Sequence, residues 1–289
     1  MMPSITLSAP PKINLFLHIT GQRDDGYHNL QTLFQLLDGG DQLTFAVTEN
    51  SDIHLTPQVD GVAEEDNLIV RAAKALQQKT GCKLGCSIAV DKKLPMGAGL
   101  GGGSSNAATT LLALNSLWQC DLSLVELAAL GSVLGADVPV FVMGRSAFAE
   151  GIGDELTPFD IANSWYLIIT PPCKVSTGEI FSNPQLTRHS LPIKIRALSE
   201  EQYRNDCQAI VEELYPQVKE VVEWIENFAK PMMTGTGASV FCRWETQAEA
   251  NRVLAAVPQH WDAFVARGVN NSQVHQQLRD FFTGASPSG

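Results

Sequence analysis

A glycine-rich run that opens directly into an apolar, helix-spaced segment constrains the fold of this chain more than any other feature. Residues 95–105 read PMGAGLGGGSS and include five glycines. Glycine lets a backbone turn tightly and come close to a ligand, so successive N–H groups can face an anion. Apolar residues with helical spacing run from Ala107 to Trp118 and predict a helix that starts near Ser105, whose positive end favours the same anion. The run predicts a phosphate-binding loop, with a nucleoside triphosphate as the expected ligand.

Spacing separates this loop from three known glycine patterns. A Walker loop needs a lysine after its last glycine, but Ser104 follows Gly103. The residues Gly97-x-Gly99-x-x-Gly102 formally match a dinucleotide fingerprint, although Pro95 intervenes between them and the strand-like residues 86–90. A protein-kinase glycine lid requires His-Arg-Asp and Asp-Phe-Gly motifs downstream, and the sequence has neither. Only the dinucleotide interpretation stays open beside the triphosphate one.

Composition and charge exclude several classes of protein. The 289 residues are 44% hydrophobic and 18% charged, which is typical of a soluble protein large enough for two domains. The formal net charge of −11 argues against a nucleic-acid partner. Neither a signal peptide nor a membrane-spanning run is visible. The six cysteines are scattered without a Cys-x-x-Cys pair, so we expect reduced thiols and a cytoplasmic protein.

The order of predicted elements changes part-way along the chain. Alternating apolar residues at 13–19 predict a half-buried strand, and strand patterns around residues 33–37 and 43–47 follow before the first helix, expected at 67–80. The residues SLVE at 123–126 form a capping box that announces another helix. The second half is expected to contain strands at 165–170, 239–243 and 264–266 and helices at 206–215, 216–228 and 246–257. We therefore predict an α+β protein of two domains, residues 1–160 and 161–289.

Several polar residues could carry chemistry, and each has a plainer interpretation. Lys12 begins the first long strand on its polar face, where most lysines are merely solvated. Asp137 lies just beyond a helix end, where an aspartate commonly accepts backbone N–H groups. The second glycine stretch, residues 235–237, could be a turn or the second wall of a nucleotide cleft. Tyr27 and His28 could be surface residues or a flat platform for a base.

The combination resembles the GHMP small-molecule kinases. The resemblance rests on Lys12 in PPKINL, on the glycine loop, on Asp137 in GADVP and on the late Gly-Thr-Gly at 235–237, all in the family's order. It extends over nearly the whole chain, and the residues DGYH at 25–28 match the branch that acts on 4-diphosphocytidyl-2-C-methyl-D-erythritol. The resemblance implies an N-terminal domain like domain 2 of ribosomal protein S5, a ferredoxin-like C-terminal domain and an active site between them.

The resemblance also implies an activity. ATP would be the phosphoryl donor, Mg²⁺ its escort, and the 2-hydroxyl of the methylerythritol unit the acceptor, in the non-mevalonate isoprenoid pathway. Phosphoryl transfer depends mostly on positioning and charge neutralisation, so Asp137 would take the hydroxyl proton and Lys12 would offset the developing charge.

Site residues carry over position by position, and no metal ligand is assigned. Lys12 and Asp137 match the catalytic pair. The ATP loop comprises Pro95, Met96, Gly97, Ala98, Gly99, Leu100, Gly101, Gly102, Gly103, Ser104 and Ser105. The cytidyl-diphosphate substrate would be held by Asn14, Tyr27, His28, Lys92, Thr177 and Phe181, with His28 and Phe181 as stacking partners for cytosine.

Two departures from the family pattern and three rival functions accompany this assignment. Pro11 replaces a small residue and removes a backbone donor before Lys12, and Ala98 replaces a glycine, which matters only if that position needs a positive φ. The rivals are another GHMP kinase acting on homoserine, mevalonate or a sugar, an NAD-linked oxidoreductase, and a non-catalytic nucleotide-binding or RNA-associated module.

Overall fold

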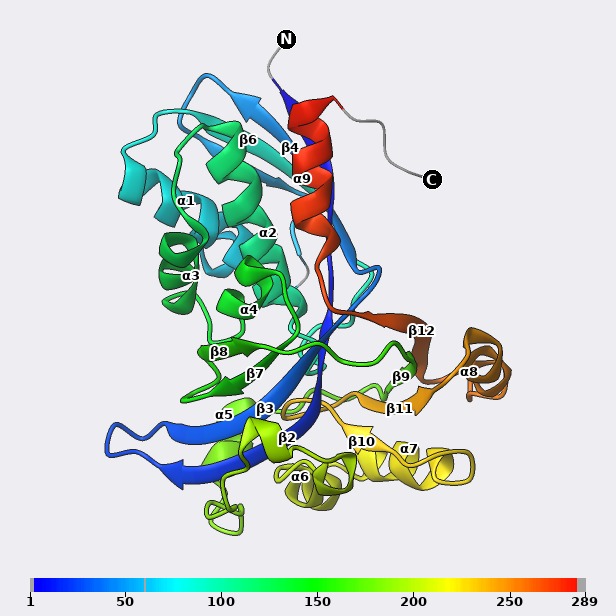
Figure 1. The fold of residues 1–289 in the computed structure, drawn as a ribbon. Coiled ribbons are helices and arrows are strands. Elements are labelled where there is room, and N and C mark those ends of the chain that lie inside the picture. The colour runs from blue at the N-terminus through cyan, green and yellow to red at the C-terminus, as the bar shows by residue number, and fades with distance from the viewer. Residues whose placement is uncertain (1–2, 60, 285–289) are drawn as a thin grey trace.

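The computed structural model describes residues 3–59 and 61–284 and shows two β-sheets with helices packed around them (Figure 1). The smaller sheet has the strand order β1 (Ser4–Ala9), β4 (Asp41–Thr48), β6 (Gly85–Asp91), β5 (Ile53–Thr56). Its pairs are antiparallel except β5 with β6. The helices that share a hydrophobic core with this sheet are α1 (Leu68–Thr80), α2 (Gly102–Leu117), α3 (Leu124–Ser132), α4 (Val138–Met143) and α9 (Gln273–Thr283).

Among the described residues, the larger sheet contains the remaining strands, and four helices lie beside it. Its strand order is β10 (Met232–Met233), β11 (Val240–Trp244), β9 (Trp165–Thr170), β12 (Asp262–Val269), β3 (His28–Leu37), β7 (Ala147–Glu150), β8 (Glu155–Pro158), and β2 (Lys12–Gln22) pairs with β3. The helices beside it are α5 (Thr177–Ser182), α6 (Gln208–Leu214), α7 (Pro216–Ile225) and α8 (Gln247–Leu254). Strand β12 pairs with β9 through residues 262–267 and with β3 through residues 268–269. One strand therefore joins the two halves into a continuous sheet.

Local signals explain several of these elements. Asn67 caps α1 by accepting the N–H of Ile69, and Gly81 ends the helix in the left-handed conformation. Ser123 and Glu126 form the capping box expected at the start of α3. Helix α2 begins at Gly102 rather than near Ser105, so the last two glycines of the run belong to the helix.

The expectation that β2 is half-buried is wrong. Both faces of the strand are covered over most of its length, and Lys12 is only 3% exposed. The glycine loop covers Lys12, because the Lys12 N–H donates to the carbonyl of Leu100 at 3.0 Å. Further along, the segment around Asn205 bridges to Leu17 and covers the strand there. The buried apolar residues of β2 divide along the strand between two cores, with residues 13–16 contributing to one and Leu17 and Ile19 to the other.

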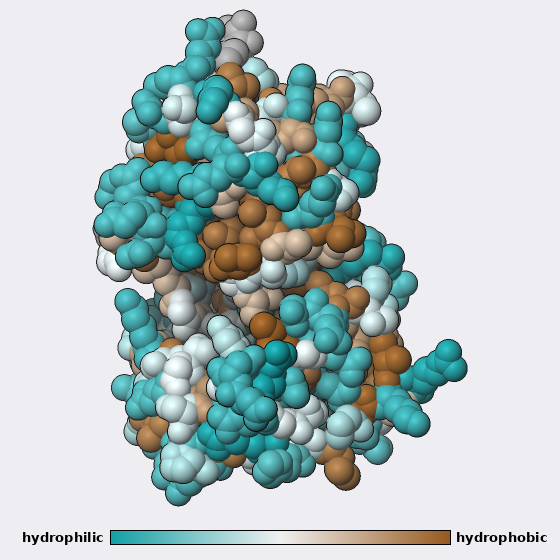
Figure 2. Space-filling view, turned by 90° about the vertical axis from the view of Figure 1, so that its left-hand side faces the viewer, coloured by the Kyte–Doolittle hydropathy of each residue, from teal (hydrophilic) through white to brown (hydrophobic). Residues whose placement is uncertain are grey.

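The division into residues 1–160 and 161–289 remains a proposal, and two elements cross it. Helix α9 packs in the core of the first half through Val274 and Leu278. Strand β2 contributes Leu17 and Ile19 to the core of the second half. Figure 2 shows a narrowing between an upper and a lower part of the molecule, with hydrophobic residues gathered above it. No helix in the described part of the chain is long and apolar enough to cross a membrane.

Candidate active site

Two cavities meet at the glycine loop. The larger, about 520 Å³, lies between β2, β3, the glycine loop and residues 235–237. The smaller, about 330 Å³, is lined by residues 95–104 together with the start of α1. Gly97, Gly99, Gly101 and Ser104 line both cavities. Volumes of this size are typical of small-molecule sites, and the shared loop would let two ligands meet end to end.

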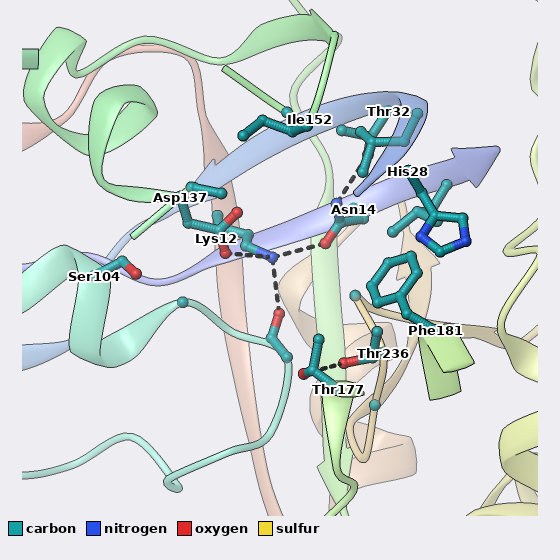
Figure 3. Close-up of a pocket in the computed structure, with 18 of the residues that line it drawn as sticks. Lys12, Asn14, His28, Thr32, Ser104, Asp137, Ile152, Thr177, Phe181 and Thr236 are labelled. Carbon is teal, nitrogen blue, oxygen red and sulfur yellow. Dashed lines mark hydrogen bonds and ion pairs between the residues drawn. The ribbon is translucent and has the colours of Figure 1, made fainter. Parts of the chain in front are cut away.

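Lys12 and Asp137 come together at this junction (Figure 3). The Lys12 Nζ lies 3.2 Å from the Asp137 Oδ2, with the aspartate side chain 31% exposed. Asp137 immediately precedes α4, but its side chain makes no capping hydrogen bond to that helix. The plainer interpretation, in which this carboxylate caps a helix by accepting backbone N–H groups, therefore does not apply. It faces the larger cavity with oxygen lone pairs available to a hydroxyl.

Three acceptors surround the buried ammonium of Lys12. Besides Asp137, the Nζ donates to the Asn14 Oδ1 at 2.8 Å and to the Gly99 carbonyl at 3.1 Å. It also lies 5.3 Å from the centre of the Phe34 ring. A buried ammonium is costly unless it is hydrogen-bonded and paired. Its three N–H donors match the three oxygens, so Lys12 acts as a fixed positive charge beside the glycine loop.

The second glycine stretch closes against the first. The Thr234 hydroxyl, fully buried, accepts from the Asn14 N–H at 3.0 Å and lies 3.2 Å from the Gly99 carbonyl. Gly99 has a φ of +77°, and a Cβ there would collide with the Thr234 carbonyl oxygen. Glycine is therefore required at this position by both conformation and space. Residues 235–237 line the larger cavity, as expected of a second wall.

Five of the six residues assigned to the cytidyl substrate line the larger cavity: Asn14, Tyr27, His28, Thr177 and Phe181. The rings of His28 and Phe181 lie 5.1 Å apart at an interplanar angle of 31°. The Thr177 and Thr236 hydroxyls are hydrogen-bonded at 2.9 Å (Figure 3). Tyr27 is 62% exposed at the mouth of the cavity. A flat platform with hydroxyls nearby is suited to a planar base carrying polar groups.

Arg188 is a functional candidate that sequence reasoning missed. Its Nε donates to the His28 Nε2 at 3.1 Å, and its Nη2 donates to the Phe181 carbonyl at 2.9 Å. A guanidinium has no acceptor, so the His28 Nε2 must carry a lone pair and the ring hydrogen lies on Nδ1. Burial, and secondarily the Arg188 charge, lowers the pKa of His28 below its ordinary value of 6.5. His28 is therefore neutral and offers an N–H donor.

Lys92 lies apart from the other five substrate residues. It lines the smaller cavity and not the larger one. Its ammonium forms an ion pair with the fully buried Asp41 carboxylate, which also accepts the N–H groups of Lys93 and Leu94 at 2.8 and 2.9 Å. The assignment of Lys92 to the cytidyl substrate stays a prediction, and its position favours contact with the ligand of the smaller cavity.

Within the glycine run, Ser105 differs from its neighbours. It is fully buried, lines neither cavity, and its Oγ has no hydrogen-bond partner among the described residues. Ala98 does not adopt a positive φ, so the alanine in place of glycine is tolerated. Pro11 does not disturb the start of β2, because Lys12 pairs with Leu36 and the Pro11 carbonyl accepts the Leu37 N–H at 3.0 Å.

Comparison with known proteins decides the family. The model of the GHMP kinases N terminal domain matches residues 67–145, and that of the GHMP kinases C terminal matches residues 184–263. The chain belongs to the GHMP kinases. A 4-diphosphocytidyl-2-C-methyl-D-erythritol kinase of Pseudomonas syringae pv. syringae is 53% identical over 277 residues, which cover 96% of this chain and 98% of the relative.

Solved structures of other GHMP kinases are similar to this one. A crystal structure of 4-(cytidine 5'-diphospho)-2C-methyl-D-erythritol kinase matches with a TM-score of 0.80 and 32% identity, covering 92% of this chain and all of the other. A homoserine kinase from Cytophaga hutchinsonii matches with a TM-score of 0.63 at 18% identity, over 95% and 97% of the two chains, which shows a shared fold alone. The two-domain α+β fold of a GHMP kinase is thereby confirmed.

Proposed function

We propose that this chain transfers the γ-phosphoryl group of ATP to the 2-hydroxyl of 4-diphosphocytidyl-2-C-methyl-D-erythritol, a step of the non-mevalonate isoprenoid pathway. One observation carries the proposal: the Lys12–Asp137 pair lies where the two cavities meet at the glycine loop. A phosphate donor bound on one side and an alcohol bound on the other would meet at that pair.

The smaller cavity has the properties of an ATP site. The glycine loop and the first turn of α2 present backbone N–H groups to an anion, and the α2 dipole favours negative charge there. Val59, Val62 and Leu68 supply an apolar wall on the other side of the cavity. An adenine ring against that wall would leave the triphosphate along the loop, pointing toward Lys12.

The larger cavity has the properties of a cytidyl-diphosphate site. The His28–Phe181 pair would stack on cytosine, and Tyr27 at the mouth would cover it. Thr177 and Thr236 offer hydroxyl groups between the base and the glycine loop. The methylerythritol end would then extend toward Asp137.

The chemical step needs little covalent help from the protein. The 2-hydroxyl oxygen attacks the γ-phosphorus in line, the bond to the β-phosphate oxygen breaks, and ADP leaves. Asp137 takes the proton that the hydroxyl releases, a contribution of roughly 10²–10⁴-fold when the base is well placed. Lys12 holds the carboxylate in position and offsets the negative charge that accumulates beside Gly99.

A magnesium ion is compatible with the donors present. No group of three or more His, Cys, Asp or Glu side chains gathers in a metal-binding arrangement among the described residues. Mg²⁺ in nucleotide enzymes is commonly held by phosphate oxygens, waters and one or two side chains, so it needs no such group. The Ser104 hydroxyl and the Asp137 carboxylate are the oxygens that would hold it, and the ion would supply charge neutralisation for the phosphates.

We also propose a cytoplasmic location. All six cysteines are free thiols, as in a reducing compartment where ATP is abundant. The large negative net charge keeps nucleic acid an unfavourable partner.

A coupled assay of ADP release tests the proposed reaction. The purified protein should release ADP with 4-diphosphocytidyl-2-C-methyl-D-erythritol, and not with homoserine, mevalonate or galactose at equal concentration. Turnover with any of these three alcohols at a comparable rate would contradict the proposed acceptor. ATP should also change the intrinsic fluorescence of the protein in a titration. A change with NADH but not with ATP would contradict ATP as the phosphoryl donor.

A further inference from the structure

Asn14, beside the catalytic pair, makes its contacts through both ends of one amide group. Its Oδ1 accepts from the Lys12 Nζ at 2.8 Å, and its Nδ2 donates to the Thr32 Oγ1 at 2.8 Å. The residue is 2% exposed, so water does not substitute for either contact. The Lys12 ammonium keeps all three of its oxygen partners only when the oxygen end of the Asn14 amide faces it.

Thr32 favours the same orientation from the other end of the amide. Its hydroxyl donates its single hydrogen to the Phe16 carbonyl, 2.5 Å away, because a carbonyl oxygen can only accept. The Thr32 Oγ1 can then only accept from Asn14, and the amide must present its NH₂ end to Thr32. The opposite orientation would place two N–H donors against the Lys12 ammonium and an oxygen against the Thr32 lone pairs.

A bulge in the β2–β3 ladder provides the Phe16 carbonyl. Asn14 pairs with Phe34 and Leu17 with Thr32, so two residues of β2 stand opposite the single residue Leu33. Such a bulge leaves a residue without its ladder partner and redirects its groups. The Phe16 carbonyl takes the Thr32 hydroxyl instead. Thr32 is completely buried and lines the larger cavity.

We propose that Thr32 is a positioning residue for phosphoryl transfer, because its hydroxyl fixes the Asn14 amide in the one orientation that holds the Lys12 ammonium between Gly99 and Asp137. The inference rests on the proposed function for its kinetic consequences. Its structural content, the orientation of the amide, stands on the hydrogen bonds alone.

Three variants isolate the hydroxyl. Thr32→Val removes it while keeping the shape of the side chain, and Thr32→Ser retains it. Thr110→Val is the matched control, since Thr110 is also fully buried and its hydroxyl also donates to a backbone carbonyl, that of Asn106, at 2.8 Å. Should Thr32→Val fail to fold, Thr32→Ala compared with Thr32→Ser differs again by the hydroxyl.

Steady-state kinetics should separate positioning from folding. We expect the kcat of Thr32→Val to fall by about 10-fold or more, because misplaced catalytic groups can cost about 10- to 10²-fold, while the KM for ATP stays within about 2-fold, since neither Thr32 nor Asn14 lines the smaller cavity. Thr32→Ser should retain kcat within about 3-fold, and Thr110→Val should lose thermal stability without losing kcat. A wild-type kcat in Thr32→Val, an equal loss in Thr32→Ser, or a loss confined to KM would overturn the proposal.

An NMR readout keeps the inference distinct from the proposed function. In the wild-type protein and in Thr32→Ser, the Asn14 side-chain amide protons should exchange slowly with solvent. In Thr32→Val their exchange should accelerate and their shifts should change. Unchanged Asn14 signals in Thr32→Val would overturn the inference whatever the enzyme phosphorylates, whereas failure of the wild-type ADP assay alone would overturn only the proposed function.

Discussion

At the scale of single residues, the centre of the candidate site is an ion pair between two residues that no local sequence pattern links. Lys12 and Asp137 lie 125 positions apart, yet their charged atoms are separated by 3.2 Å. All three N–H donors of the lysine are used by Asp137, Asn14 and Gly99. The aspartate still has oxygen lone pairs that can accept a hydrogen bond. This asymmetry supports the proposed roles, in which the carboxylate accepts the proton and the ammonium offsets charge.

Asp137→Asn tests the carboxylate. The amide keeps the size of the side chain but cannot take up a proton, so kcat should fall by roughly 10²–10⁴-fold. KM for ATP and for the cytidyl substrate should change far less than kcat, because the amide keeps the size of the side chain on the cavity wall and its oxygen can still face the magnesium ion. Near wild-type turnover would remove Asp137 from the base role, and a thermal melt would check that the variant is folded.

His28→Ala tests the proposed cytosine platform. Loss of one stacking partner costs roughly 1–3 kcal/mol, which corresponds to an increase in the KM for the cytidyl substrate of about 5- to 150-fold. The KM for ATP should be unchanged, since His28 does not line the smaller cavity. An equal loss for both substrates would contradict the stacking assignment.

At the scale of elements, the sequence predicts those whose ends carry chemical signals. Asn67, Ser123 and Thr246 are residue types that commonly cap helices, and three helices begin directly after them, close to the starts predicted from the sequence. Helix α4 was not predicted, because its six residues VPVFVM are apolar throughout and show no period. Helix α5 is also missing from the predicted elements, because six residues are too few to show a helical period.

The contact between the two glycine stretches belongs to this scale as well. Gly99→Ala would force a Cβ against the Thr234 carbonyl and would displace both loops. We expect kcat to fall on the order of 10²-fold, because the Lys12 acceptor at Gly99 moves with the loop. Gly21→Ala is the control, since a Cβ there meets only the Asn29 Nδ2 at 3.9 Å. Equal kcat values in the two variants would exclude a functional contact between the loops.

At the scale of the whole molecule, the sequence predicted the class of fold but not how its halves interlock. Periodicity identified β12 and placed it in the second half, yet its pairing with both β9 and β3 depends on the register of distant strands. The meeting of Lys12 with Asp137 depends on the same long-range packing. Only the resemblance to a family connected those two residues in advance, and the geometry then brought them together.

Three histidines whose rings are shielded from water should make the stability of the molecule depend on pH. Burial is the largest cause that lowers the pKa of His18, His28 and His275 below 6.5. The unfolded chain then binds more protons than the folded chain just below pH 6.5, so the free energy of unfolding should fall as pH is lowered through that range. The melting temperature should therefore decrease from pH 7 to pH 5.

Replacing one of these histidines checks the cause. His275→Gln should make the melting temperature less sensitive to pH, because the Nε2 of His275 is buried without a hydrogen-bond partner in the described part of the chain. His54→Gln, at an exposed position on β5, should leave the sensitivity unchanged. A melting temperature that is constant from pH 7 to pH 5 in the wild-type protein would contradict the prediction.

The return of α9 to the first sheet has a consequence for biosynthesis. Val274 and Leu278 lie in the same core as residues of β1, and Gln277 accepts the Ser8 N–H at 3.1 Å. Ser8 and Gln277 lie 269 positions apart, so the ribosome makes β1 well before the helix that covers it. A nascent chain keeps apolar surface on β1 uncovered until α9 emerges, so the core around the smaller sheet is completed only after the strands of the larger sheet have been made.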